Sequence, residues 1–140
     1  LDPLIVLKQA VDLHTSTFTQ LISARCLDTG LMNAHMPAVR ELYKTQCSCM
    51  LEALEKYFPQ GTSWTKPDGG MFIWVNTDEM MKEALDRKVA YVPGSAFYAN
   101  EPELNKMRLS FVTVPPEKID AGIKILAQLV KERIDAREAK

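Results

Sequence analysis

The sequence predicts an α+β fold in which a small, largely antiparallel sheet packs against helices in two layers. Met71–Val75 is a short, continuous apolar run, which is typical of a strand covered on both faces. Apolar and polar residues alternate from Lys106 to Val112, which is the pattern of a strand with one buried face. Residues 39–58 and 119–134 carry apolar side chains at helical spacing and would form the second layer.

The N-terminal segment is predicted to form two helices. An aspartate followed by a proline at residues 2–3 can cap and begin a helix that reaches about Leu13. Thr17 and Gln20 have the spacing of a capping box, so a second helix should begin there. This helix should end at Gly30, because glycine adopts the left-handed conformation of a helix C-terminus without strain.

A third helix and the first strand are expected in the middle of the chain. The helix should begin at about Ala34–Met36, which leaves Pro37 close to its first turn, and it should end at Phe58. Pro67–Gly70 has the composition of a turn and leads into the strand Met71–Val75.

A short helix and a second strand should follow. Thr77 and Asp78 can cap a helix that extends to about Arg87. Val89–Val92 is rich in β-forming residues and is ended by Pro93–Gly94, so it is predicted to be a strand.

The last two elements have the clearest patterns. In the strand Lys106–Val112, Met107, Leu109 and Phe111 should occupy one face, and the residues between them the other. A proline and acid opening at Pro115–Glu117 then begins a C-terminal helix.

Length and charge narrow the class of protein. The chain has 140 residues, 46% of them apolar, and is expected to form a single domain over residues 1–140. With 17 basic and 18 acidic side chains, it has no excess of positive charge for nucleic acid or an anionic membrane. No apolar run approaches the roughly 20 residues that span a bilayer, and a cytoplasmic location is expected.

The cysteines and histidines do not predict a metal site. Cys26, Cys47 and Cys49 lack chelating spacing, and His14 and His35 are too scattered to complete a ligand set. Buried, reduced thiols that pack as small hydrophobic groups are expected instead.

Arg108 is the residue that most needs an explanation. It lies in the middle of an otherwise apolar strand, where an uncompensated cation is costly. Its guanidinium could bind a carboxylate of an amino acid or oxo acid through two parallel hydrogen bonds. Alternatively, Arg108 lies on a solvated face of the sheet or pairs with a structural Asp or Glu.

Four other positions could have a functional role, but each also has an ordinary structural explanation. Gly69–Gly70 could allow close approach of a ligand or chain, or could form a simple turn. Pro93–Ser95 could form the lip of a pocket but lacks the glycine spacing of a phosphate loop. Lys8 and Lys66 have no environment that would lower an amine pKa, so they are expected to be solvated.

Five segments of the chain follow one another in a distinctive order and spacing, namely Lys8–Gln20, Arg40–Tyr43, Pro67–Trp74, Val92–Tyr98 and Met107–Phe111. Together they resemble the C-terminal part of fold type I aminotransferases that use pyridoxal phosphate. The similarity is greatest to the 2-aminoadipate, kynurenine and multi-substrate subgroup. The chain departs from the family pattern at Gln46, Ser48 and Lys88. These departures bear on the local packing of helices more than on membership of the family.

The resemblance implies a role for Arg108 and implies what the chain lacks. By resemblance, Arg108 binds the α-carboxylate of the substrate, and the fold is that of the family's small domain. The Schiff-base lysine and the pyridoxal phosphate site belong to a large domain that precedes this segment, so no catalytic, cofactor or metal residue is assigned here. The chain is therefore expected to be an inactive C-terminal fragment. Its parent would be a homodimeric aminotransferase acting on amino acids and 2-oxo acids.

Two alternatives stay open. The chain could be the effector domain of a transcription regulator, in which an aminotransferase-like domain follows a winged helix. It could also be a free-standing module that binds amino acids with Arg108 as the anchor and performs no covalent chemistry.

Overall fold

The computed structural model describes residues 2–139, which divide by their internal contacts into two compact units. The N-terminal unit comprises Leu1–Arg40 and the C-terminal unit Glu41–Lys140. The division falls within a long helix, α3 (Leu31–Tyr57).

The N-terminal unit contains α1 (Asp2–Val11), α2 (Thr17–Asp28) and the first part of α3. None of its described residues is buried. Gly30 follows α2 with a φ of +73°, which confirms the predicted stop.

The start of α2 differs in detail from the prediction. Ser16 occupies the N-cap position and makes no side-chain capping bond, so Thr17 is the first helical residue and not the cap. The Gln20 side chain donates to the Thr15 carbonyl oxygen (2.7 Å) and does not complete a capping box.

The C-terminal unit contains a four-stranded antiparallel sheet with the order β1-β2-β4-β3. Its strands are β1 (Ser63–Trp64), β2 (Phe72–Asn76), β3 (Val92–Pro93) and β4 (Lys106–Ser110). The α+β class is confirmed. The strand predicted over Val89–Val92 is shorter and lies later, while β1 was not predicted, because two residues carry no periodic signal.

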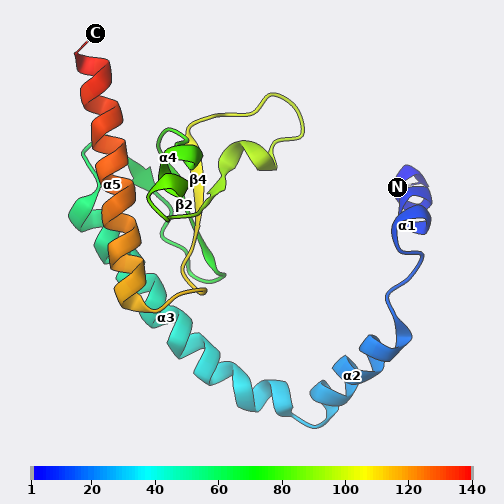
Figure 1. The fold of residues 1–140 in the computed structure, drawn as a ribbon. Coiled ribbons are helices and arrows are strands. Elements are labelled where there is room, and N and C mark those ends of the chain that lie inside the picture. The colour runs from blue at the N-terminus through cyan, green and yellow to red at the C-terminus, as the bar shows by residue number, and fades with distance from the viewer. Residues whose placement is uncertain (1, 140) are drawn as a thin grey trace. The chain divides into compact units, whose positions relative to one another are not determined.

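One face of this sheet forms the core with α5 (Pro116–Glu138) and the C-terminal part of α3 (Figure 1). The buried side chains of the central strands are Ile73, Val75, Met107 and Leu109. The buried apolar side chains of the two helices are Met50, Ala53, Leu54, Ile119, Ile123, Leu126, Ala127, Leu129 and Val130. The predicted alternation in β4 is confirmed, since alternate residues of this strand are buried.

Hydrogen bonds from α3 add to this packing. The Gln46 side chain donates to the Val114 carbonyl oxygen (2.9 Å), and the Tyr57 hydroxyl donates to the Asp120 carboxylate (3.2 Å). The helix begins at Leu31, earlier than predicted, so Pro37 lies inside it. Proline lacks the N–H that would bond four residues back, which is why it was expected nearer the start.

The short helix α4 (Met81–Asp86) also begins differently from the prediction. Its N-cap is Met80, so Thr77 and Asp78 do not cap it. Thr77 instead donates its backbone N–H to Asn105 (2.9 Å), and Asp78 pairs with Arg137 on α5 (2.6 Å). The Asp78 carboxylate, which could have capped the helix, is thus paired with Arg137, whereas the Thr77 bond uses its backbone N–H and not the hydroxyl of a cap.

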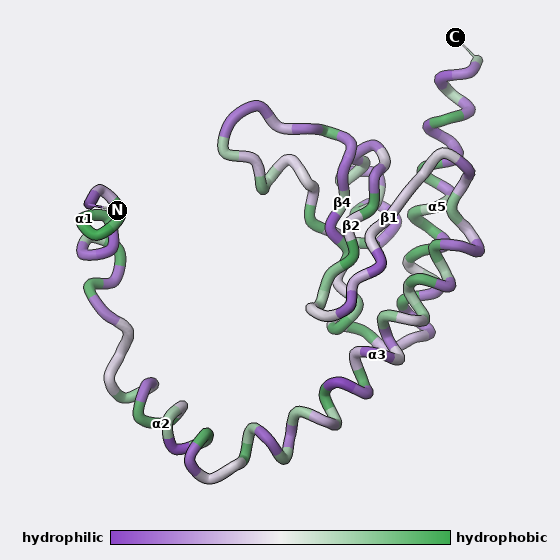
Figure 2. Tube along the Cα trace, turned by 180° about the vertical axis from the view of Figure 1, so that it is seen from behind, coloured by the Kyte–Doolittle hydropathy of each residue, from purple (hydrophilic) through white to green (hydrophobic). Residues whose placement is uncertain are grey.

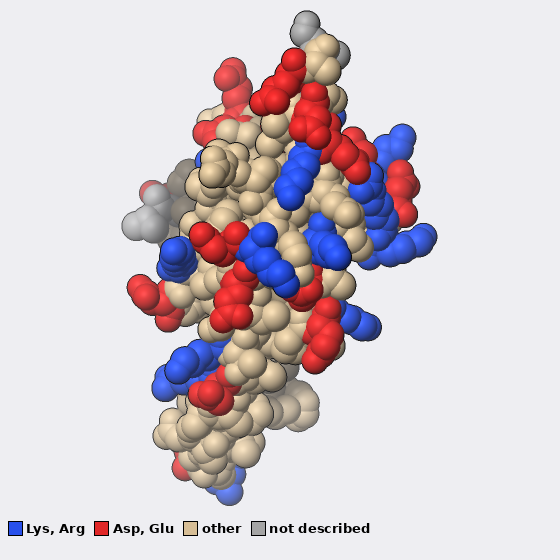
Figure 3. Space-filling model, turned by 90° about the vertical axis from the view of Figure 1, so that its left-hand side faces the viewer, with Lys and Arg blue, Asp and Glu red and all other residues tan. Residues whose placement is uncertain are grey.

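The surface carries charges of both signs. Figure 3 shows acidic and basic side chains interspersed over one face of the molecule. Among the helices of residues 2–139, none is both long and apolar enough to cross a membrane.

Candidate functional site

Arg108 lies at the centre of the sheet, on the face opposite the core. It stands opposite Trp74 of β2 and Val92 of β3 in the antiparallel register. Its chain neighbours Met107 and Leu109 point into the core, while Arg108 itself is half-buried. The strand period therefore places Arg108, together with Lys106 two residues before it, among the outer-face side chains of the sheet.

Two aromatic rings flank the guanidinium of Arg108. Its Cζ lies 4.0 Å from the ring centroid of Phe72 and 4.5 Å from that of Phe97. Phe97 in turn meets Trp74 edge to face, with the ring centroids 5.3 Å apart. Aromatic faces attract cations, so these rings stabilise the charge and limit the orientation of the guanidinium plane.

The hydrogen-bonding capacity of this guanidinium is not used within the described chain. Its Nε is buried and has no hydrogen-bond partner, and Arg108 forms no ion pair with any acid among residues 2–139. The alternative of a structural Asp or Glu partner therefore finds no support there. A buried guanidinium donor without an acceptor is costly, and a carboxylate is the acceptor that matches its geometry best.

The prediction that Met71–Val75 is covered on both faces is wrong for the outer face. Phe72 and Trp74 are only half-buried, while Ile73 and Val75 are fully buried. Phe72 and Phe97 were not identified as site residues from the sequence. The alternation of side chains along β2 gave one hint for Phe72. It places Phe72 on the same face of the sheet as Trp74, which stands opposite Arg108.

The predicted loop Pro93–Ser95 lies next to this site. A short 3-10 helix, η1 (Gly94–Phe97), begins there and carries Phe97. A Cβ atom on Gly94 would lie 2.5 Å from Cβ of Lys106, so only glycine allows η1 to approach β4 this closely. Ser95 donates its backbone N–H (2.7 Å) and its hydroxyl (2.8 Å) to Glu79.

Gly69 and Gly70 form the turn before β2. Gly70 has a φ of +89°, which favours glycine, and a Cβ atom on either residue would meet no atom within 4 Å. This supports the interpretation of the pair as an ordinary turn.

A hollow of about 390 Å³ lies over the same outer face. It is lined by Thr65, Trp74, Asn76, Phe97, Tyr98 and Lys106. The Lys106 ammonium donates to Glu103 (2.7 Å) and to the Tyr98 hydroxyl (2.9 Å). These bonds raise the pKa of Lys106, and the bond to Lys106 lowers the pKa of Glu103, so both groups stay charged near neutral pH.

The described lysines lack the setting of a Schiff-base amine. Lys8 is exposed and pairs with Asp12, and Lys66 is exposed. Within residues 2–139 every lysine is exposed except Lys106, which is half-buried and held by its ion pair. A nucleophilic amine requires desolvation or a neighbouring cation to lower its pKa.

The three cysteines form no disulfide and are half-buried, so the prediction that they are buried is wrong. Burial raises the pKa of the Cys47 and Cys49 thiols, and Cys49 contacts the Pro116 carbonyl oxygen (3.4 Å). Across the described part of the chain, no three His, Cys, Asp or Glu side chains gather closely enough to hold a metal ion.

The outer face thus presents an arginine, flanked by two aromatic rings and without an ion-pair partner among residues 2–139, on the sheet of an α+β unit. Comparison with known proteins assigns the chain to a family. Residues 5–126 match the family of class I and II aminotransferases. The chain belongs to this family, which confirms the resemblance found in its sequence.

Relatives of known name agree with this assignment. The chain is 45% identical over 135 residues to aromatic-amino-acid aminotransferase 1 of Thermococcus litoralis, covering 92% of this chain and 32% of that protein. A crystal structure of Pyrococcus horikoshii kynurenine aminotransferase in complex with PMP is 46% identical, with a TM-score of 0.81, over 91% of this chain and 33% of that one. The multiple substrate aminotransferase of Thermococcus profundus is 43% identical, with a TM-score of 0.83, over 94% and 34%. The chain therefore spans about one third of the length of these relatives.

A more distant match bears on the regulator alternative. The chain is 28% identical over 132 residues to an uncharacterised HTH-type transcriptional regulator, YdfD of Bacillus subtilis, covering 90% of this chain and 27% of that protein. Aminotransferases and such regulators thus share this segment.

Proposed function

We propose that the chain is the C-terminal part of a pyridoxal-phosphate-dependent aminotransferase, in which Arg108 binds the α-carboxylate of the substrate. The longer enzyme would transfer an amino group between an amino acid and a 2-oxo acid and act as a cytoplasmic homodimer. The observation that carries the proposal is the Arg108 guanidinium, which is held between two rings and has a buried Nε without a partner.

The geometry supports a positioning role for this arginine. The rings of Phe72 and Phe97 lie near the guanidinium and leave its hydrogen-bonding edge for an acceptor. We expect a carboxylate to bind this guanidinium through two parallel hydrogen bonds, because its donors lack such an acceptor within residues 2–139. Such a pair holds the substrate in one orientation, which lowers the entropic cost of reaching the reactive geometry.

The described residues do not fit the binding of pyridoxal phosphate, because no desolvated lysine is found among residues 2–139. When bound, this cofactor supplies the electron sink for the carbanion. We infer that its lysine and its phosphate ligands lie in the two thirds of the relatives' length that the chain does not cover. The 140-residue chain alone should then be inactive. A borohydride-reduced adduct of pyridoxal phosphate on one lysine, found in stoichiometric yield by mass spectrometry, would contradict this.

Kinetics of the full-length enzyme test the role of Arg108. We expect Arg108→Ala to raise the KM for the amino acid about a hundredfold, since it removes one partner of a charged hydrogen-bonded pair. Arg87→Ala is the matched control, because Arg87 forms only a surface ion pair with Glu132 (2.6 Å). Circular dichroism should show that both variants keep the native fold. Unchanged kinetics of a folded Arg108→Ala enzyme would rule out the assignment.

The similarity to YdfD supports a second candidate, the effector domain of a regulator. The sequence that precedes this segment in the longer protein separates the two. A winged-helix domain there would favour the regulator, and a pyridoxal phosphate domain without one would favour the enzyme.

A further inference from the structure

We propose that Glu79 is a positioning residue for carboxylate binding: through Ser95 it fixes η1 and thereby holds Phe97 against the guanidinium of Arg108. The inference rests on the proposed role of Arg108 and adds a residue that does not itself contact the substrate. It is built from three connected contacts.

The first contact is the bond between the Glu79 carboxylate and Ser95. One carboxylate oxygen accepts the Ser95 backbone N–H (2.7 Å), and the other accepts the Ser95 hydroxyl (2.8 Å). Among residues 2–139, this carboxylate forms no ion pair, so both of its oxygens serve the link to η1. Hydrogen bonds to a carboxylate are stronger than neutral ones, and a short 3-10 helix depends on such external bonds.

The second contact joins η1 to the arginine. Ser95 and Phe97 lie in the same turn, which is closed by a hydrogen bond from the Tyr98 N–H to the Ser95 carbonyl oxygen (3.3 Å). Phe97, the last residue of η1, places its ring centroid 4.5 Å from Cζ of Arg108. Displacement of Ser95 should therefore move the Phe97 ring off the guanidinium.

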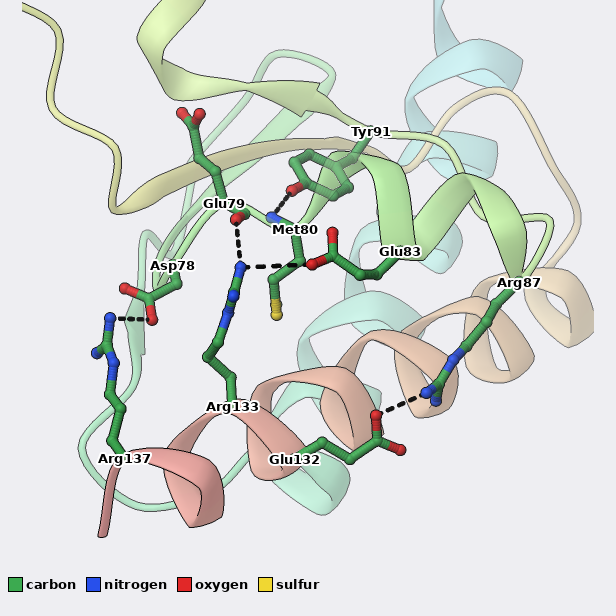
Figure 4. A network of polar contacts seen from close by, with 9 residues as sticks. All are labelled: Asp78, Glu79, Met80, Glu83, Arg87, Tyr91, Glu132, Arg133 and Arg137. Carbon is green, nitrogen blue, oxygen red and sulfur yellow. Dashed lines mark hydrogen bonds and ion pairs between the residues drawn. The ribbon is translucent and has the colours of Figure 1, made fainter. Parts of the chain in front are cut away.

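The third set of contacts holds Glu79 itself in place. Its N–H donates to the Leu104 carbonyl oxygen (3.0 Å), and its own carbonyl oxygen accepts a bond from Arg133 on α5 (3.4 Å). The adjacent Met80 N–H donates to the hydroxyl of Tyr91. Figure 4 shows that the backbone of Glu79 faces α5, while its carboxylate points away from that helix. A fixed backbone makes this carboxylate a rigid anchor for η1.

The loss of this anchor has a specific consequence. Without Glu79, η1 would lose two charge-assisted hydrogen bonds, and Phe97 would no longer limit the orientation of the guanidinium. A carboxylate would then bind to a hydrated and mobile arginine. Its affinity would be lower because the arginine side chain must be ordered on binding, and because water weakens the attraction between the two charges. Substrates without a carboxylate should not be affected.

Kinetics of the full-length enzyme with Glu79→Ala test the proposal. We expect kcat/KM for the amino acid to fall about tenfold, mainly through KM, because hydrogen bonds to a charged group are lost. The single-turnover rate with an amine that has the same side chain but no α-carboxylate should stay unchanged. Glu79→Gln retains an acceptor for the Ser95 N–H and should recover most of the loss.

Glu83→Ala is the matched control, because Glu83 contacts Arg133 (3.5 Å) on the same side of α5 but makes no bond to η1. It should leave both reactions unchanged. In an Arg108→Ala background, Glu79→Ala should have no further effect on KM, since the group that it positions is absent.

Several outcomes would overturn the inference. They are an equal loss with both substrates, no loss with either, or a full additional loss in the Arg108→Ala background. If Arg108→Ala raises KM while Glu79→Ala does not, only this inference fails. If Arg108→Ala itself has no effect, the proposed function fails first.

Discussion

The two units of this chain differ sharply in how they use apolar residues. In residues 2–40 large apolar side chains such as Leu4 (65% exposed) and Phe18 (71%) lie open, and no described residue is buried. Every buried residue lies within residues 41–139. Figure 2 shows hydrophobic residues along α1 and α2 as well as along the strands. Both units contain large apolar side chains, but these side chains are buried only where other residues of the same unit pack against them.

The largest difference between the two units is expected when a leucine in each is replaced by alanine. Leu54→Ala removes a fully buried side chain and should lower the free energy of unfolding of the 140-residue chain by about 2–5 kcal/mol. Leu21→Ala removes a side chain that is 65% exposed and should change it by less than about 0.5 kcal/mol. Urea denaturation followed by circular dichroism measures both. Equal losses would mean that residues 2–40 pack as tightly in solution as the core.

Replacing a glycine by alanine in each unit should give a smaller difference in stability between the units. Gly94→Ala places a methyl group 2.5 Å from Cβ of Lys106 and should cost about 1–3 kcal/mol in the main unfolding transition. Gly30→Ala forces alanine to a φ of +73° and should cost about 1 kcal/mol, seen as local loss of helix in residues 2–40.

Gly69→Ala is the control for these two variants, because it has neither a positive φ nor a close neighbour. Hydrogen exchange should locate each effect, alongside the urea midpoint. A lower main midpoint for Gly30→Ala, or an unchanged one for Gly94→Ala, would contradict the separation of the two units.

The smallest effects are expected from removing one ion pair in each unit. Lys106 lowers the pKa of Glu103 below its ordinary value of 4.5. This pair therefore contributes stability above pH 4.5, and the contribution is lost as the pH falls through the lowered pKa. The wild type should have a slightly higher unfolding midpoint than Glu103→Gln at pH 7, and the difference should shrink as the pH falls below 4.5 and vanish once Glu103 is protonated in the folded state. Asp12→Asn, which removes the partner of Lys8, should leave the main midpoint unchanged.

A difference for Glu103→Gln that does not shrink as the pH is lowered below 4.5 would mean that the charge of Glu103 is not its cause. An effect of Asp12→Asn on the main midpoint would show that the N-terminal unit takes part in the cooperative transition.

Local signals in the sequence predicted several elements correctly. The stop at Gly30, the alternation in β4 and the strand β2 each depend on residues a few positions apart. The predictions failed where distant groups competed. Asp78 has the right chemistry to cap a helix, but Arg137 on α5 pairs with its carboxylate.

The sequence by itself determined that the chain forms helices and a small sheet, and that a strand carries one unexplained cation, Arg108. These features follow from periodicity and from the cost of an unpaired charge, which are properties of neighbouring residues. Only the tertiary structure decided that Phe72 and Phe97 flank this cation and that Glu79 anchors the turn that carries Phe97. Contacts between segments far apart in the chain depend on strand register and packing, which have no local signature.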